Sequence, residues 1–204
     1  MTNDWDETYR EKNVSDRSWT EAIPQSSLRL IEAAGVGLGD ALIDIGGGAA
    51  RLVDELRRRR FHDLSVLDAS QLALDEARAR LGDDDVNWIH ADLMEWQPDR
   101  QYRLWHDRAV FHFLVVPDQQ ARYVELCESV IEPGGALVMG VFSLRGPETC
   151  SGLSVRRWSA EDLSERFANG FATVTSFEHD HVTPWGSVQP FIWVLLKRRG
   201  GTED

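Results

Sequence analysis

The sequence predicts an α/β fold: a doubly wound, mostly parallel seven-stranded sheet with helices on both faces. The observation behind it is that short apolar runs alternate with helical patterns from residue 41 onward. The predicted strands cover residues 41–45, 64–67, 86–89, 102–105, 136–142, 171–177 and 189–196. The last two are joined by a loop containing Pro184, Trp185 and Gly186, without a crossover helix. One antiparallel strand is therefore expected at the C-terminal end.

The helices between these strands are predicted from apolar residues at helical spacing. They begin near Leu52, run from about 72 to 81, and run from about 118 to 131, where Pro133-Gly134-Gly135 is expected to end the helix. Ser159 and Asp162 form a capping-box pattern for one more helix. We expect one domain over residues 41–199, a helical arm or lid over 1–40, and a disordered tail over 200–204.

Composition and charge limit the kinds of partner that this protein is expected to bind. The 204 residues carry 34 acidic and 22 basic side chains, a net charge of −12, which disfavours a nucleic-acid partner. Cys127 and Cys150 lack metal-ligand spacing, and no metal site is expected. The sequence offers no signal region and no apolar run of membrane-spanning length, so no membrane contact and a cytoplasmic location are expected. A monomer or homodimer is expected.

Candidate ligand-binding residues follow the first three strands, at the edge where open α/β sheets bind ligands. Gly46, Gly47 and Gly48 come directly after the first strand, where missing side chains let the backbone approach a ligand. Asp44 precedes this loop and is placed to orient it or to bind an ammonium group. Asp68 ends the second strand, where a carboxylate can accept hydrogen bonds from two ribose hydroxyls. Asp92 follows the third strand and could accept from an adenine amino group.

Two alternatives apply to these residues. Any one glycine or aspartate here could be structural, and Asp68 could be a helix N-cap. A dinucleotide site is disfavoured, because Gly46 and Gly48 are followed by Arg51 where the fingerprint needs a third glycine.

Taken together, the segments Asp44-Ile45-Gly46-Gly47-Gly48-Ala49-Ala50, Asp68, Ala91-Asp92 and Pro133-Gly134-Gly135 resemble the class I S-adenosylmethionine (SAM)-dependent methyltransferase family over residues 40–199. The resemblance implies a Rossmann-like fold, SAM as cofactor and S-adenosylhomocysteine (SAH) as product. It implies that the glycines line the methionine moiety, that Asp68 with Ala69 binds the ribose, and that Asp92 and Leu93 frame the adenine. The chain departs from the family at Ala50, where the loop often has a third glycine.

The candidate catalytic residues follow the fourth strand: His106, Asp107, Arg108 and His112. This stretch partly resembles both thiopurine-type and protein-lysine methyltransferases. Ala109 replaces a glycine, and His112 replaces an aspartate that could hold a lysine ammonium. Each histidine could instead be a hydrogen-bonded structural residue, and Arg108 a salt-bridge partner.

The N-terminal arm carries aromatic residues with two interpretations. Trp5 and Tyr9 lie four residues apart, on one face of a helix, and Trp19 follows. The arm could be a lid that closes over SAM and contributes Trp19 to the cofactor pocket, or a packing arm over a sheet edge. The polar segment 148–153 is a plausible acceptor loop.

The function predicted from these residues is methyl transfer from SAM to a small-molecule substrate by direct in-line displacement. The alternatives are a protein methyltransferase of the lysine type and a non-catalytic SAM-binding regulatory protein.

Overall fold

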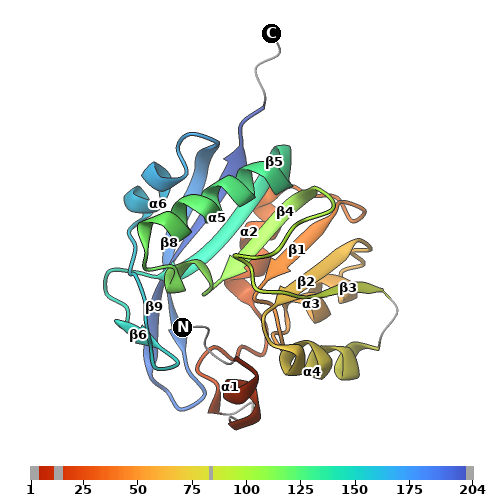
Figure 1. The fold of residues 1–204 in the computed structure, drawn as a ribbon, viewed down its shortest axis with the longest axis vertical. Coiled ribbons are helices and arrows are strands. Elements are labelled where there is room, and N and C mark those ends of the chain that lie inside the picture. The colour runs from red at the N-terminus through yellow and green to blue at the C-terminus, as the bar shows by residue number, and fades with distance from the viewer. Residues whose placement is uncertain (1–4, 12–15, 83–84, 201–204) are drawn as a thin grey trace.

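A computed structural model describes residues 5–11, 16–82 and 85–200 and has one large mixed sheet at its centre (Figure 1). The strand order is β3-β2-β1-β4-β5-β9-β8. The strands are β1 (Leu42–Ile45), β2 (Leu64–Asp68), β3 (Val86–His90), β4 (Tyr102–Arg108), β5 (Ile131–Phe142), β8 (Phe171–Val182) and β9 (Val188–Arg198). β1 to β5 pair in parallel, whereas β9 is antiparallel to both β5 and β8. The predicted Rossmann-like fold, with its one antiparallel strand, is confirmed.

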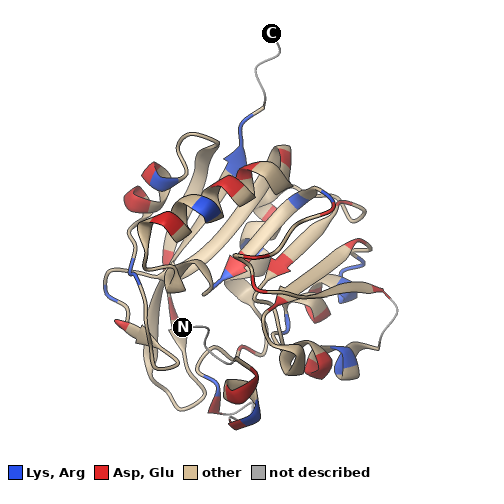
Figure 2. Ribbon diagram, viewed as in Figure 1, with Lys and Arg blue, Asp and Glu red and all other residues tan. Residues whose placement is uncertain are grey.

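Helices cover both faces of this sheet (Figure 1). One face carries α2 (Gln25–Ala34), α3 (Leu52–Arg58) and α4 (Gln71–Leu81), and the other α5 (Pro117–Val130) and α6 (Ala160–Arg166). α1 (Trp5–Glu11) lies beyond the sheet and packs on α4. The smaller elements are the 3-10 helix η2 (Phe111–Phe113) and the hairpin of β6 (Thr149–Cys150) and β7 (Leu153–Ser154). Acidic and basic residues lie together on α4, α5 and α6, on both faces of the sheet (Figure 2).

Two hydrophobic clusters form because alternate residues of each strand point to opposite faces. Ile43, Trp105 and Leu137 pack with α5 and α6 in the first cluster. Leu104 and Val138 pack with α2, α3 and α4 in the second. The parallel strands β1, β2, β4 and β5 are thus mostly buried on both faces, as near-continuous apolar runs predict.

Local sequence explains where the helices begin and end. The Ser70 hydroxyl accepts from the Ala73 amide at 3.1 Å and begins α4. Gly82, at φ 79°, ends that helix, as predicted. Ser159 and Asp162 form the predicted capping box at the start of α6.

Several element boundaries differ from the prediction. β4 ends at Arg108 instead of 105, so His106, Asp107 and Arg108 lie within the strand and do not follow it. α5 ends at Val130 and the chain is extended at Ile131, so Pro133-Gly134-Gly135 falls within β5 instead of ending the helix. A residue before proline disfavours helical geometry, which moves the boundary toward the N-terminus. β8 continues to Val182, five residues beyond the predicted end at Phe177. β8 is an edge strand, and its mostly polar residues after Phe177 lack the apolar pattern from which strands are predicted.

The expected helical arm over residues 1–40 contains α1 and α2, and α2 contributes Leu28, Leu30 and Ile31 to the second cluster. Of the expected disordered tail, residues 201–204 lie outside the described residues. Within the described residues, no helix is long and apolar enough to cross a membrane.

Ala109 adopts a left-handed backbone conformation, with φ 68°, directly after β4. This is the position where the sequence has alanine in place of a glycine. Its amide donates to the Gly140 carbonyl at 2.8 Å, which fixes the turn. The backbone of an alanine is strained at this φ. Ala50 does not have a positive φ, so its backbone is unstrained.

Ala109→Gly is therefore expected to stabilise the protein by about 1 kcal/mol, raising Tm by about 2–4 °C. Thermal unfolding checks this. Ala50→Gly is the matched control and should destabilise by about 0.4–1 kcal/mol, because glycine only adds freedom to the unfolded chain. Equal shifts in both variants would show that Ala109 is not strained.

Candidate functional site

The glycine loop after β1 is a cradle that no side chain can occupy. Gly46 and Gly48 have φ angles of 64° and 35°. A Cβ added at Gly46 would overlap the Val110 side chain, and one at Gly47 would lie 2.5 Å from Asp44 Oδ2. Glycine is therefore required in this loop, because neighbouring side chains occupy the space that its own side chains would take.

Asp44 is held by a buried chain of hydrogen bonds. His106 Nδ1 lies 2.7 Å from Asp44 Oδ1, and His106 Nε2 lies 2.9 Å from the Ser27 hydroxyl of α2. His106 is 2% exposed and both of its ring nitrogens are engaged. This geometry favours a structural role that orients Asp44 over the predicted catalytic role.

Asp68 ends β2 beside the glycine loop. Its Oδ1 accepts from the Ser70 amide at 2.8 Å, and its Oδ2 would lie 2.6 Å from a Cβ at Gly48. Burial raises the pKa of Asp68 to about 7, and the charge of Asp44 acts in the same direction. The neighbouring Ala69 carbonyl accepts from His90 Nε2 at 3.1 Å. A ligand that donates a further hydrogen bond to the Asp68 carboxylate would stabilise its charged form.

Asp92 and Leu93 form the turn after β3. Asp92 Oδ1 accepts from the Met94 amide at 2.8 Å, and the Asp92 carbonyl accepts from the amides of Glu95 and Trp96. Leu93 is buried in the first cluster, whereas Asp92 is exposed. The carboxylate therefore caps a turn, and the adenine role of both residues stays a prediction.

The N-terminal arm lies across this edge of the sheet. The Tyr9 hydroxyl would lie 3.0 Å from a Cβ at Gly48, and the Tyr9 and Trp19 rings pack edge-on at 5.9 Å. Asp6 Oδ1 accepts from the Ser70 hydroxyl at 2.6 Å and from the Leu72 amide at 3.1 Å. The arm is thus attached to the start of α4 and covers the glycine loop.

A second attachment holds the end of the arm. Arg17 binds Glu76 of α4 through two hydrogen bonds of 3.0 and 2.8 Å and lies over the Tyr9 ring at 4.5 Å. Sequence reasoning missed Asp6, Arg17 and Glu76, because their partners are 59 or more residues away along the chain.

Asp107 is a buried residue near the end of β4, and its side chain binds the turn that follows the strand. Its carboxylate accepts from the amides of Val110 and Phe111 and from the Tyr123 hydroxyl, the last at 2.6 Å. Burial raises the pKa of Asp107 to about 6, although the Tyr123 hydrogen bond lowers it. The side chain is 0% exposed, which favours a structural role over the predicted catalytic one.

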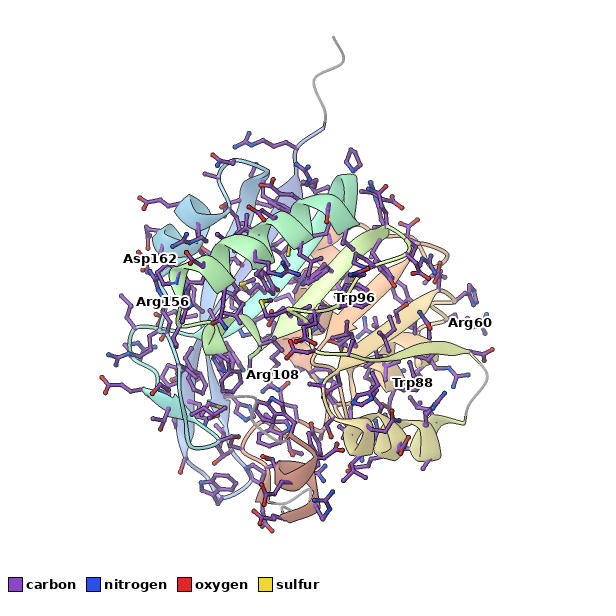
Figure 3. All side chains as sticks on the ribbon, viewed as in Figure 1. Arg60, Trp88, Trp96, Arg108, Arg156 and Asp162 are labelled. Atoms are coloured by element: carbon purple, nitrogen blue, oxygen red, sulfur yellow. The ribbon has the colours of Figure 1, made fainter. Side chains whose placement is uncertain are left out.

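Arg108 lies at the end of β4, between the sheet and the N-terminal segment (Figure 3). Its Nη1 donates to the Trp19 carbonyl at 2.8 Å, and its Nη2 lies 3.3 Å from Glu21 Oε1. The guanidinium also stacks over Phe191, 5.4 Å from the ring centroid. Arg108 therefore connects the sheet to the N-terminal arm.

His112 is fully buried in η2. Its Nδ1 accepts from the Phe142 amide at 3.5 Å, and its ring packs 4.6 Å from that of Phe142. Burial, with the charge of Arg108 adding to it, lowers the pKa of His112 to about 3. A neutral ring that accepts at Nδ1 carries its proton on Nε2, so His112 is a donor there and not a base.

The segment 148–153 forms most of the β6–β7 hairpin. Ser151 and Gly152, with φ angles of 51° and 79°, make its two-residue turn. Cys150 packs against the second cluster and interacts electrostatically with Arg108. The predicted acceptor loop therefore lies beside the residues that follow β4.

Known proteins with similar sequences carry the same domain. Residues 42–135 match the family model described as a methyltransferase domain. The chain is 29% identical over 108 residues to N-terminal Xaa-Pro-Lys N-methyltransferase 1 of Danio rerio, covering 50% of this chain and 47% of that protein. The chain thus spans about half the length of this curated relative.

Solved structures share the fold. The N-methyltransferase NodS of Bradyrhizobium japonicum WM9, in complex with SAH, is 17% identical, with 94% of this chain and 97% of that chain covered at a TM-score of 0.71. The 1,6-didemethyltoxoflavin-N1-methyltransferase of Burkholderia thailandensis, also bound to SAH, is 15% identical, with 96% and 83% covered at a TM-score of 0.70.

Residues 42–135 thus match a methyltransferase domain, and the chain shares its fold with SAM-dependent methyltransferases. SAM is the methyl donor of this domain, and the residues at the carboxyl edge of the sheet fit it. The glycine loop runs directly beside Asp44 and Asp68, and the Asp68 carboxylate can accept from ribose hydroxyls. The individual roles of Asp44, Asp68, Ala69, Asp92, Leu93 and Trp19 in this methyltransferase domain remain predictions.

Asp68→Ala is expected to weaken SAM binding by about 1–3 kcal/mol, because the ribose would lose charge-assisted hydrogen bonds. Titration calorimetry measures the affinity. The affinity of the unaltered protein should also fall as pH drops below about 7, since SAM favours the ionised carboxylate and the pKa of Asp68 in the protein alone is about 7. Above about pH 8 the affinity should level off.

Asp68→Asn serves as the control for this pH dependence, because the amide does not titrate. It should bind SAM weakly at every pH, without the decline near pH 7. An unchanged affinity in Asp68→Ala would mean that Asp68 only caps α4 and that the ribose binds elsewhere.

Proposed function

We propose that this protein methylates a small-molecule acceptor in a closed site, and the observation that carries this is the attached N-terminal arm. Asp6 and Arg17 bind α4, while the Trp19 carbonyl binds Arg108 at the end of β4. The arm therefore bridges the two halves of the carboxyl edge, where methyl transfer takes place in this fold. A covered site favours an acceptor small enough to be enclosed.

The four predicted catalytic residues support catalysis by positioning. When bound, SAM supplies a methyl group whose carbon bonds to the acceptor atom as its bond to sulfur breaks, leaving SAH. His106 has both nitrogens engaged, Asp107 is buried in its turn, and His112 presents a protonated Nε2. None of these three is placed as a general base. An acceptor that is already nucleophilic, such as a thiolate or carboxylate, fits this arrangement best.

The Tyr9 hydroxyl helps to keep this site dry. Burial raises the pKa of Tyr9 well above its ordinary value, so the phenol stays neutral beside Asp68. With Trp19 packed on its ring, Tyr9 excludes water from the glycine loop, which strengthens the interactions that orient donor and acceptor.

A protein acceptor is the second candidate, favoured by the sequence similarity to N-terminal Xaa-Pro-Lys N-methyltransferase 1. Such an acceptor would need an open channel with acidic residues for a cationic amine. Against it, the residues after β4 offer the Arg108 guanidinium and the His112 donor instead of a free carboxylate. The net charge of −12 supports an acceptor other than nucleic acid.

The test uses methyl-labelled SAM and a cell extract separated into macromolecular and small-molecule fractions. We expect the label to enter small molecules and to stay there after proteins are removed. Label on proteins would support the second candidate and overturn the small-molecule proposal. SAM binding without transfer to either fraction would support the non-catalytic regulatory protein.

The arm can be tested separately through Arg17→Ala, which removes the ion pair with Glu76 and the contact with the Tyr9 ring. We expect SAM to dissociate about tenfold faster, because a partly buried ion pair contributes on the order of 1–2 kcal/mol. Stopped-flow fluorescence of bound SAM or SAH gives the rate.

Arg57→Ala is the matched control, since Arg57 pairs with Asp85 at 2.6 Å on the exposed side of α3, away from the arm. Its dissociation rate should be unchanged. Equal rates in Arg17→Ala and the unaltered protein would show that the arm is a packing segment and not a lid.

A further inference from the structure

We propose that the acceptor carries an anionic oxygen group, a carboxylate, sulfonate or phosphate, bound by Arg108 with His112 and Ser151 as flanking donors. The inference rests on the proposed small-molecule methyl transfer and names the chemical class of its substrate. The juxtaposition that supports it is a set of buried polar atoms, from three elements, that have no hydrogen-bond partner among the described residues.

Arg108 has more donor capacity than its neighbours use. Its side chain is 11% exposed, and one nitrogen, Nη1, is bonded to the Trp19 carbonyl. Nε and Nη2 have no hydrogen-bond partner within the described part of the chain, although Nη2 lies 3.3 Å from Glu21. A buried guanidinium is costly unless its donors are satisfied, and two adjacent N–H groups match two oxygens of one anion.

Glu21 does not fully compensate the Arg108 charge, because it also faces His181. His181 Nδ1 lies 3.3 Å from Glu21 Oε1, and His181 Nε2 donates to the Ser18 carbonyl at 2.6 Å. The Glu21 carboxylate is thus shared between Arg108 and His181. The other nearby carboxylate, Asp44, is paired with His106. Arg108 Nε and Nη2 therefore keep unused donors for an incoming anion, while both nearby carboxylates also contact histidines.

His112 adds a donor on the same aromatic surface. The His112 ring packs on Phe142, Phe142 packs on Phe191 at 4.9 Å, and Arg108 stacks over Phe191. His112 Nε2 is fully buried and has no hydrogen-bond partner among the residues described. Since Nδ1 is the acceptor, Nε2 carries a proton that it can donate to an oxygen.

Ser151 brings a third donor from the β6–β7 hairpin. Its hydroxyl is buried and, within the described ranges, has no hydrogen-bond partner. The adjacent Cys150 interacts with Arg108, which places the hairpin turn near the guanidinium. The Arg108 guanidinium, the neutral His112 ring and the Ser151 hydroxyl can all donate hydrogen bonds. Such a site prefers oxygen anions over amines.

This set of donors also lies next to the cofactor cradle. Val110, between Arg108 and His112 in sequence, is the side chain that a Cβ at Gly46 would overlap. An anion held at Arg108 would therefore position the rest of the acceptor near the methionine end of SAM, where the methyl group is transferred.

The first experiment separates a small-molecule extract on an anion-exchange resin before incubation with the protein and methyl-labelled SAM. We expect the acceptor in the salt eluate and not in the flow-through. Label only in the flow-through would overturn the anionic acceptor while leaving small-molecule methylation intact. No label in either fraction would mean that the proposed function itself fails, and this inference with it.

The second experiment compares Arg108→Gln with Arg108→Lys, using the retained fraction as acceptor. We expect the KM for acceptor to rise about ten- to hundredfold in Arg108→Gln and less in Arg108→Lys, which keeps the charge. KM for acceptor is measured at saturating SAM, so that a weaker contact between Arg108 and the Trp19 carbonyl of the arm does not affect it. A normal KM in Arg108→Gln would overturn the proposal, because Arg108 would then only hold the Trp19 segment.

Arg198→Gln is the matched control. Arg198 also stacks on an aromatic ring, Phe171, and donates to the Glu128 carbonyl, but it lies at the end of β9, away from the glycine loop. The KM of Arg198→Gln for acceptor should equal that of the unaltered protein. A comparable rise in KM for Arg198→Gln would attribute the Arg108 effect to general loss of stability.

Discussion

The buried hydrogen bond between Asp44 and His106 joins β1 to β4 at the edge of the sheet where the site forms. The two residues are register partners on adjacent parallel strands, so the bond requires both strands to be in place. It continues through His106 to Ser27 of α2, which belongs to the second hydrophobic cluster. The position of the carboxylate beside the glycine loop therefore depends on core packing, and not on the loop alone.

Burial has opposite effects on the groups at this edge. It raises the pKa values of Asp68 and Asp107 and lowers that of His112, since a low-dielectric environment disfavours each charged form. Asp107 is satisfied by the Tyr123 hydroxyl and two amides, and so it stabilises the turn. His112 and Arg108 retain unused donors, and these are the groups on which the proposed anion site rests.

Much of the fold followed from the sequence because its evidence is local. Strand residues such as Leu42 and Ile43 form a continuous apolar run, and Ser159 with Asp162 is a short capping pattern. Element ends were less predictable where tertiary contacts decide them. β8 extends to Val182 because it pairs with β9 along its whole length, although its own residues are mostly polar. Ala50 fits its loop because that position does not have a positive φ, whereas Ala109 is the strained one.

By itself, the sequence determined the mostly parallel sheet, its antiparallel strand near the C-terminal end, the glycine loop and the acidic residues that follow successive strands. These depend on residue type and spacing along the chain, and parallel strands bring their carboxyl ends together in any such fold. Only the tertiary structure decided which candidates share a partner. The side chains of His106 and Asp107 point into the protein interior, and the arm contacts α4 through Arg17. Arg108 stacks over Phe191, and Phe191 packs on Phe142, the ring that contacts His112. Side-chain direction and contacts between distant segments come from packing, which residue spacing does not encode.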